Sequence, residues 1–417
     1  MLRFFHTSDW HLGQLFFNHS RHEEHEQFLD WLLDQLQQKQ PHALLIAGDV
    51  FDVVNPSTGA LKQFNRFLAA AHQRVPHLQI LVIAGNHDSG PRLEQVEPLL
   101  TKYNTHVVGT ISWNHNKQLQ LDKLLIPIKD QQSQIIAWCI ALPFLRPAEI
   151  TASGEHYQHA MQATEQLYQL LLDEAEKRKT PDQALILMTH AHMTGGTSSD
   201  SERPIIIGNS EALSTQLFSS SSGLQPDYVA LGHLHRPQQI EHPHIRYSGS
   251  PIPLSFSELT YKHQVIEVNL RNNLVEIEPL YIPRTVALIK IRQDLENTLK
   301  EIRQLPALNE LSFEKRPFLD IEYFSDAPPP PDLRQQIEQL LPTNSYRLVS
   351  LRRAIRQAGT HPDPINNEAV LIEPPTPLEL FSQLWQQQGF EQDLQVIQDF
   401  KALQLQAETS RQDEAQA

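Results

Sequence analysis

The chain has 417 residues, of which 40% are hydrophobic and 20% are charged, and its formal net charge is −15. This length allows two or three domains, and the composition excludes a chain that is disordered, collagen-like or coiled-coil throughout. The negative charge opposes indiscriminate binding to nucleic acid, so a polyanionic substrate would need local cations, bound metal or a partner's surface.

No apolar run approaches the roughly 18 residues that cross a membrane, and the N-terminus reaches an acidic residue before a signal region could develop. We therefore expect a cytoplasmic protein without membrane contact. The single cysteine, Cys139, excludes an internal disulfide. The 21 histidines are unusual, because imidazole is a common metal ligand and a general acid or base.

The first 110 residues alternate short apolar runs with longer amphipathic ones. We expect strands at 2–6, 42–47 and 78–84, and helices at 24–37 and 59–72. Strands separated by helices predict a parallel sheet, and ligands of such sheets gather at the carboxyl ends of the strands.

The following region predicts a second sheet. After a helix at 157–177, further strands are expected at 184–188, 227–231, 245–248 and 263–270, and their close spacing indicates antiparallel or mixed pairing. A loop rich in Gly, Ser and Thr interrupts them at 193–202.

Composition divides the chain into five segments. We expect a large α/β domain over 1–280 and a small α+β domain over 281–356. A proline-rich linker follows over 357–377, then two amphipathic helices over 378–406 and a disordered tail over 407–417.

Four short motifs carry the chemistry, and each of the first three directly follows an expected strand. They are Asp9-Trp10-His11, Gly48-Asp49, Gly85-Asn86-His87-Asp88 and Gly232-His233-Leu234-His235. Any one of them alone is commonly a turn or a strand cap. In this order, at strand ends that meet at one sheet edge, they favour a metal site. A carboxylate such as that of Asp49 could bridge two ions about 3.5–4 Å apart.

The motifs together resemble the calcineurin-like metallophosphoesterases. Longer runs are similar to those of the nuclease subunits of bacterial DNA-repair complexes: HTSDWHLGQ at 6–14, AGDVFD at 47–52, AGNHDS at 84–89, LGHLHRPQ at 231–238 and YSGSPIPLSF at 247–256. The resemblance implies a four-layer αββα sandwich with a small α+β capping domain and C-terminal helices.

The resemblance also implies two sets of metal ligands. The first set is Asp9, His11, Asp49 and His235, and the second is Asp49, Asn86, His190 and His233. Two divalent ions are expected there, manganese first and magnesium as the alternative. His87 corresponds to the catalytic histidine of the family.

Two positions near these ligands stay open. His190 and His192 share strand parity, so spacing cannot choose between them, and the resemblance favours His190 because it directly follows the apolar run. Asp52 stands where some relatives carry a substrate-positioning histidine, and we assign it no catalytic role.

The expected function is a metal-dependent DNA nuclease, acting as an exonuclease on duplex ends and as an endonuclease on single strands or hairpins. The resemblance implies an SMC-like ATPase partner that receives the C-terminal helices, a homodimer within a heterotetramer, and nucleoid association when DNA is bound. The alternatives are a phosphodiesterase or phosphatase on the same fold, or a non-catalytic subunit that binds DNA ends.

Overall fold

The computed structural model describes residues 1–114, 119–146, 149, 160–202, 212–271, 274–308, 310–325, 329–354 and 396. The chain divides into two compact units, Met1–Arg356 and Gln357–Ala417. The expected linker, amphipathic helices and tail fall in the second unit, where they lie outside the described residues apart from residue 396.

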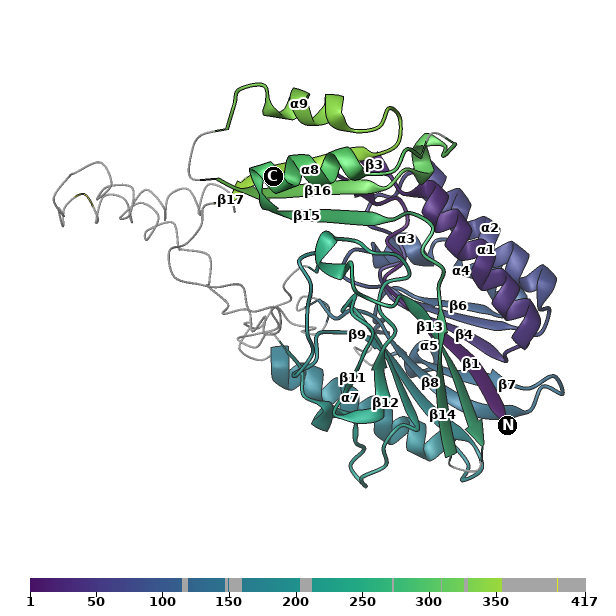
Figure 1. The fold of residues 1–417 in the computed structure, drawn as a ribbon. Coiled ribbons are helices and arrows are strands. Elements are labelled where there is room, and N and C mark those ends of the chain that lie inside the picture. Colours follow the sequence, from purple (N-terminus) through teal and green to yellow (C-terminus); the bar gives the residue numbers. More distant parts are fainter. Residues whose placement is uncertain are drawn as a thin grey trace. The chain divides into compact units, whose positions relative to one another are not determined.

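A six-stranded sheet begins the first unit, in the order β14-β13-β1-β4-β5-β6. Its parallel part is formed by β1 (Leu2–Thr7), β4 (Ala43–Ala47), β5 (Gln79–Ile83) and β6 (Thr105–Val108). The helices α1 (His22–Lys39) and α2 (Thr58–Arg74) connect these strands and lie side by side on the outer face (Figure 1).

One strand expected in the second sheet completes the first one instead. The strand β13 (Gln264–Arg271) pairs antiparallel with β1, and β14 (Leu274–Tyr281) pairs with β13 at the edge. The sequence prediction for 263–270 was therefore wrong in its sheet. Close spacing reveals a strand, but it does not reveal which unpaired edge that strand will fill.

Side chains along the central strands point alternately to the two faces of the sheet, and they contribute to two separate hydrophobic clusters. Leu44 and Ile46 of β4 face α1 and α2, where they pack with Phe28 and Phe67. The intervening side chains, such as that of Leu45, face the second sheet. This two-residue period gives β4 two buried faces, which explains its uninterrupted apolar sequence.

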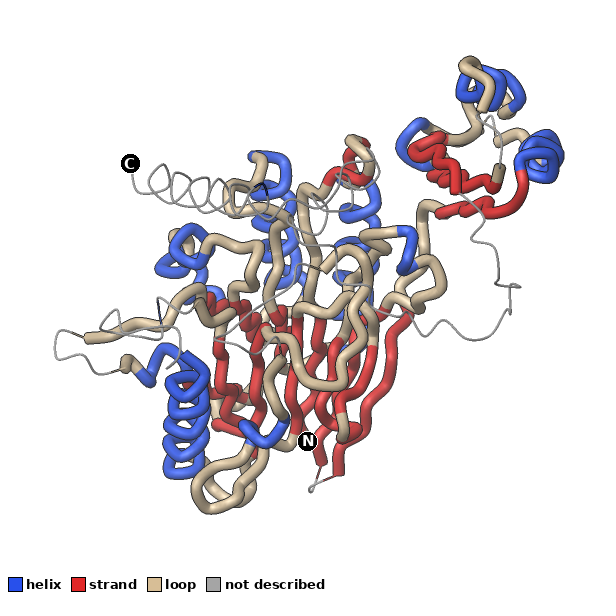
Figure 2. The backbone as a smooth tube through the Cα atoms, turned by 90° about the vertical axis from the view of Figure 1, so that its left-hand side faces the viewer, coloured by secondary structure: helices blue, strands red, loops and turns tan. Residues whose placement is uncertain are grey.

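The second sheet has the order β11-β12-β10-β9-β8-β7 and mixed pairing, as the sequence predicted. Its strands are β7 (Leu125–Lys129), β8 (Ile135–Leu142), β9 (Ala184–His190), β10 (Tyr228–Gly232), β11 (Gln238–Ile240) and β12 (His242–Tyr247). Figure 2 shows the strands of both sheets gathered in the middle of the unit.

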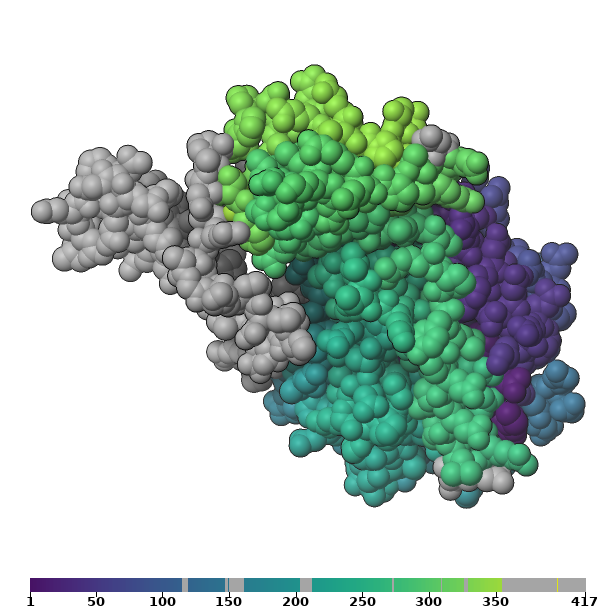
Figure 3. Space-filling view, viewed as in Figure 1, coloured from purple at the N-terminus to yellow at the C-terminus, as the bar shows by residue number. Residues whose placement is uncertain are grey.

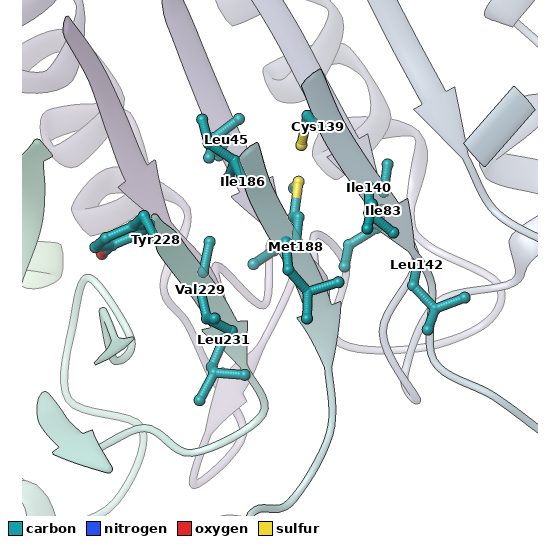
Figure 4. Close-up of a cluster of buried hydrophobic side chains, with 14 of the residues drawn as sticks. Leu45, Ile83, Cys139, Ile140, Leu142, Ile186, Met188, Tyr228, Val229 and Leu231 are labelled. Carbon is teal, nitrogen blue, oxygen red and sulfur yellow. The ribbon is translucent and has the colours of Figure 1, made fainter. Parts of the chain in front are cut away.

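The two sheets enclose the larger hydrophobic core. Ile186 and Met188 of β9 lie in it with Leu45 and Ile83 of the first sheet (Figure 4). The helix α7 (Ala160–Arg178) belongs to the same cluster through Leu171. Two helices, two sheets and α7 thus form the expected four-layer αββα sandwich.

The capping segment is a β-α-β-α-β unit. It consists of β15 (Leu288–Asp294), α8 (Leu295–Gln304), β16 (Phe318–Phe324), α9 (Leu333–Leu340) and β17 (Arg347–Ala354). Its three strands are parallel, which refines the expected α+β arrangement, because each helix makes a crossover between parallel neighbours.

The capping segment, in light green, lies directly against the sandwich (Figure 3). A small cluster of buried apolar residues joins the two. Phe16 lies in the short hairpin of β2 (Leu15–Phe16) and β3 (His19–Ser20), and its ring centroid is 4.9 Å from that of Phe318 in β16.

Three further helices in the described part of the chain are short: α3 (Gly90–Glu94), α4 (Glu97–Leu100) and α5 (Leu121–Leu124). Among the described residues, no helix is long and apolar enough to cross a membrane.

Candidate metal centre

The sequence motifs meet at the carboxyl ends of strands from both sheets. Asp9 and His11 follow β1, Asp49 follows β4, and His233 follows β10. All four have positive φ, at 54°, 47°, 50° and 110°. Such conformations are uncommon for residues other than glycine and tend to collect at functional sites. Here the sharp turns bring these four side chains to one edge of the sandwich.

Glycines next to the ligands allow the backbones to approach closely. A Cβ on Gly85 would lie 2.1 Å from Oδ1 of Asp49, and a Cβ on Gly232 would lie 1.8 Å from the carbonyl oxygen of Ala47. Only glycine fits at either position. Packing therefore requires the glycines in the Gly-Asn and Gly-His pairs of the motifs, and the residues that follow them are the candidate ligands.

Asp49 is the centre of the cluster. Its Oδ2 atom lies 3.4 Å from Nε2 of His190 and 3.6 Å from Nε2 of His11. One carboxylate oxygen thus faces histidines that extend from two different sheets. Its Oδ1 accepts a hydrogen bond of 2.8 Å from the backbone N–H of His87.

The other expected ligands divide into two groups around Asp49. On one side, Asp9, His11 and His235 offer ligand atoms that all lie within 4.8 Å of one another. On the other side, Oδ1 of Asn86 lies 2.9 Å from Nε2 of His190 and 3.2 Å from Nδ1 of His233. All seven ligand residues named from the sequence are therefore brought together.

Hydrogen bonds orient three of the imidazoles. Nδ1 of His190 donates to the carbonyl oxygen of Ala47 at 2.9 Å. Nδ1 of His11 lies 3.1 Å from Oδ1 of Asp52, and Nδ1 of His235 lies 3.2 Å from Oε1 of Glu258. Because Nδ1 is engaged in each case, Nε2 is the nitrogen that each ring can offer to a metal.

The residues fit a divalent cation. Nε2 of His11 is buried and has no hydrogen-bond partner among the described residues, although it lies beside the Asp49 carboxylate. A buried polar atom without a partner is costly, and a bound cation would satisfy it. Imidazole nitrogens combined with carboxylate and amide oxygens suit ions such as manganese.

Electrostatics keep the central carboxylate charged. Burial alone would raise the pKa of Asp49, but the neighbouring His190 and His11 outweigh it and hold the pKa below its ordinary value. Burial raises the pKa of Asp88 to about 6, with the charge of Asp49 acting in the same direction. Asp88 accepts hydrogen bonds from the backbone N–H groups of Val50, Phe51 and Gly85, so it fixes the turns that carry the ligands.

His87 lies beside the candidate ligands and belongs to neither of the two expected sets. It is 7% exposed, and its ring centroid is 4.7 Å from that of His11. Its Nδ1 donates to the carbonyl oxygen of Asp52 at 2.8 Å, which fixes one proton and the orientation of the ring. Asp52 therefore holds both His11 and His87, a role that the sequence reasoning did not assign to it.

The geometry distinguishes His190 from His192 as a candidate ligand, which their spacing in the sequence could not do. His190 lies in the group with Asp9 and Asp49, whereas His192 is in none of the candidate groups found among the described residues, and its ring centroid lies 5.9 Å from that of His233. Glu258 is a residue that the sequence reasoning missed. It lies two positions beyond the 247–256 motif and far along the chain from His235, so no local pattern indicated it.

Comparisons with known proteins identify the family. Residues 2–237 match the calcineurin-like phosphoesterases, and residues 284–389 match a family described as the type 5 capsule protein repressor C-terminal domain. The SbcD subunit of the SbcCD nuclease from Rhodobacter capsulatus is 38% identical over 323 residues, which cover 76% of this chain and 77% of the relative. The corresponding protein from Escherichia coli K12 is 36% identical over 366 residues, covering 85% and 86%.

The chain belongs to the SbcD family of calcineurin-like phosphoesterases. The expected family and the expected sandwich fold are thereby confirmed. Membership also implies divalent metal binding, and the edge of the sandwich that holds Asp49 offers the candidate ligands.

Proposed function

We propose that this protein is the nuclease subunit of an SbcCD-type DNA-repair complex and hydrolyses DNA phosphodiester bonds with two divalent cations. It acts as an exonuclease on duplex ends and as an endonuclease on single strands and hairpins. The observation that carries the proposal is the position of Asp49, whose Oδ2 faces both His11 and His190. A bridging carboxylate is the feature that two-metal hydrolases need.

Each cation would have its own set of side chains. The first would be held by Asp9, His11, Asp49 and His235, and the second by Asp49, Asn86, His190 and His233, all of which lie close together. Manganese is the preferred ion and magnesium the alternative. Such ions supply an activated water nucleophile and neutralise charge on the phosphate.

His87 handles the proton at the leaving oxygen. The carbonyl oxygen of Asp52 fixes Nδ1, so the Nε2 side of the ring is the side assigned to the substrate. A protonated His87 donates to the departing oxygen as the P–O bond breaks. Because no side chain becomes phosphorylated, the reaction is a single displacement by water.

The partner in this proposal is an SbcC-type SMC-like ATPase. The names of the relatives describe SbcCD complexes, and the match over 284–389 extends past the capping segment into the second unit. With a net charge of −15, the chain depends on that partner for part of its attraction to DNA. The assembly is a homodimer of this chain within a heterotetramer, located in the cytoplasm and on the nucleoid when DNA is bound.

The decisive experiment incubates the full-length protein with labelled duplex, hairpin and single-stranded DNA and with a small phosphodiester. Each substrate is tested with manganese, with magnesium and with a chelator. We expect metal-dependent DNA cleavage that Asp49→Asn abolishes. Cleavage of the small phosphodiester alone would contradict the nuclease assignment.

A second experiment tests the partner. Removing residues 376–417 is expected to abolish co-purification with the ATPase while preserving manganese-dependent cleavage of short single strands. Undiminished binding of the ATPase by the truncated chain would show that the partner surface lies elsewhere.

A further inference from the structure

The strand β12 begins with two histidines that the proposed reaction does not use. His242 and His244 alternate with Pro243, so their side chains lie on the same face of the strand. Their rings stack in nearly parallel planes, with centroids 5.7 Å apart and an angle of 8° between the planes. Within the described part of the chain, no hydrogen bond or ion pair engages either imidazole. Both rings can therefore offer a nitrogen to a ligand.

The hairpin that carries these histidines has an irregular backbone. Ile240 of β11 pairs with His242, whereas its neighbour Gln239 pairs with Arg246, so β12 bulges between the two pairs. Glu241 forms the turn with a positive φ of 50°. Bulges re-aim side chains and are common beside functional sites, and a positive φ is uncommon for glutamate. The backbone thus departs from a regular ladder where the histidines lie.

Glu241 adds a carboxylate to the two imidazoles. Its side chain lines the same cavity of about 240 Å³ as those of His242 and His244. The hydroxyl of Thr215 donates a hydrogen bond to Oε2 of Glu241, which orients the carboxylate and assigns Oε1 to a ligand. Two imidazoles and one carboxylate are a donor set typical of zinc sites that keep a water as the fourth ligand.

The size and charge of the cavity favour a metal ion. Its volume is below the range of about 300–1,000 Å³ that is typical of sites for small organic molecules, and none of the residues that line it is a lysine or an arginine. Burial and the neighbouring His242 lower the pKa of His244, although Asp227 acts in the opposite direction. The imidazole of His244 is therefore neutral at physiological pH, which is the form that binds metal.

This cluster lies apart from the candidate metal centre. The strands β12 and β10 are parallel, and Ile245 pairs with Val229 near the start of β10. His233 follows the other end of β10, which the rise of a strand places about 13 Å from Val229. A metal ion bound by His242 and His244 would therefore be additional to the two ions of the proposed reaction.

We propose that Glu241, His242 and His244 form a third metal site, which binds one zinc ion. The two rings stack rather than converge, and rotation of the exposed His242 ring about its side-chain bonds brings its nitrogen toward that of His244. The carboxylate of Glu241 and a water complete a tetrahedral set.

The zinc ion has a structural role outside the reaction, because it fastens the turn between β11 and β12. This hairpin supports the candidate metal centre at both ends. β11 begins three residues after His235. At the end of β12, the hydroxyl of Tyr247 accepts a hydrogen bond of 2.9 Å from the backbone N–H of Met193 and donates one of 2.6 Å to the carbonyl oxygen of Ala191, which follows His190.

The test measures zinc bound per chain after equilibrium dialysis of the full-length protein against zinc. Asp49→Asn is the background, because the candidate catalytic centre is expected to lose metal in that variant. Adding His244→Gln should remove one zinc ion per chain and reduce the rise in melting temperature that zinc produces. Thr215→Val removes the orienting hydrogen bond but no ligand, and it should weaken zinc binding by about 10- to 100-fold.

The matched control is His22→Gln, which removes an exposed histidine at the start of α1 and should leave the zinc content unchanged. Equal zinc content with and without His244→Gln would overturn the proposal. Loss of zinc from His22→Gln to the same degree would also overturn it, because zinc would then be scattered over surface histidines.

Cleavage of DNA in manganese tests the separation from the reaction. His244→Gln in an otherwise wild-type chain should cleave at the wild-type rate, and loss of cleavage at an unchanged melting temperature would contradict a separate site. If the wild type does not cleave DNA, the proposed nuclease function fails, whereas the difference of one zinc ion would still support the third site.

Discussion

Oε1 of Glu258 lies 3.2 Å from Nδ1 of His235, and both side chains are buried. Four further donors surround the carboxylate: the hydroxyls of Ser199, Ser201 and Ser250 and the backbone N–H of Leu254. Burial would raise the pKa of Glu258, but the hydrogen bond and charge of His235 and the other donors lower it to about 2. Glu258 is therefore an anion that keeps a proton on Nδ1 of His235, so Nε2 is the nitrogen that this ring could offer to the first of the two proposed metals.

Glu258→Gln should weaken manganese binding at one of the two proposed metal sites, the one that includes His235. Loss of such a supporting carboxylate typically costs about 10- to 100-fold in metal affinity. Calorimetric titration of the metal-free protein would show one weakened and one preserved binding step. The matched control is Glu267→Gln, which neutralises a buried glutamate paired with Arg3 and Lys39. Equal weakening by both variants would indicate a general loss of stability.

His87→Ala should separate catalysis from metal binding. Asn86 is an expected ligand and His87 is not, so the variant should retain both metals and lose about 10²- to 10⁴-fold in cleavage rate, the usual contribution of a general acid. Metal content is measured beside the rate. His192→Ala serves as the control, because that ring lies beside the ring of His233 and belongs to neither expected ligand set. A parallel loss of metal and activity in His87→Ala would make His87 a ligand.

Site residues that directly follow a strand in the sequence could be recognised from the sequence alone. The apolar runs of β4 and β5 are short and follow helices, and the polar residue types that come directly after them identify the edge where ligands gather. For this reason Asp9, His11, Asp49, Asn86, His233 and His235 could be recognised as candidates for a metal site before the structure was known. Family resemblance supplied the two ligand sets, the choice of His190 and the catalytic role of His87.

Contacts between distant segments could not be predicted in this way. The pairing of β13 with β1 joins Leu270 to Leu2, and the contact of Glu258 with His235 depends on how two loops fold over the site. Neither relationship leaves a periodic pattern in the sequence. The hydrogen bonds that Asp52 makes to His11 and His87 are similar, because the one to His87 uses its backbone carbonyl, a group that every residue type carries.

Gly85→Ala should damage the site through one methyl group. The added Cβ would lie 2.1 Å from Oδ1 of Asp49 and 2.4 Å from its backbone nitrogen, so the Asp49 carboxylate would have to move. We expect loss of both metals and of cleavage, with a stability cost of about 1–3 kcal/mol from overpacking. Metal content and thermal unfolding would be measured together.

Gly59→Ala is the matched control for that substitution. Gly59 lies in the first turn of α2, where an added Cβ would meet only the hydroxyl of Ser57, at 3.6 Å. This variant should be stabilised by about 0.4–1 kcal/mol, because alanine restricts the unfolded chain. Normal metal content in Gly85→Ala would show that the turn can relax around the methyl group.

The pH dependence of stability should contain a contribution from His6. This residue of β1 is completely buried, with Nδ1 3.0 Å from the hydroxyl of Tyr228 and Nε2 3.1 Å from the carbonyl oxygen of Leu231. Burial lowers its pKa from 6.5 to about 3, although the hydrogen bond to Leu231 acts in the opposite direction. The folded state therefore keeps the ring neutral, with its proton on Nε2.

The sign of the effect follows from proton binding. Between the unfolded pKa of 6.5 and the folded value of about 3, the unfolded chain binds a proton that the folded chain does not. The contribution of His6 to stability is therefore fully present above pH 6.5 and is lost as the pH falls. The free energy of unfolding then changes with pH by at most about 1.4 kcal/mol per pH unit.

His6→Leu should lower stability at neutral pH, because it leaves two buried polar groups without this partner. It should also reduce the slope of the free energy of unfolding against pH. Tyr228→Phe, which keeps the imidazole, should lower stability and retain the slope. Urea unfolding at about pH 5 and about pH 7 measures both quantities, and an unchanged slope in His6→Leu would mean that this histidine is protonated in the folded protein.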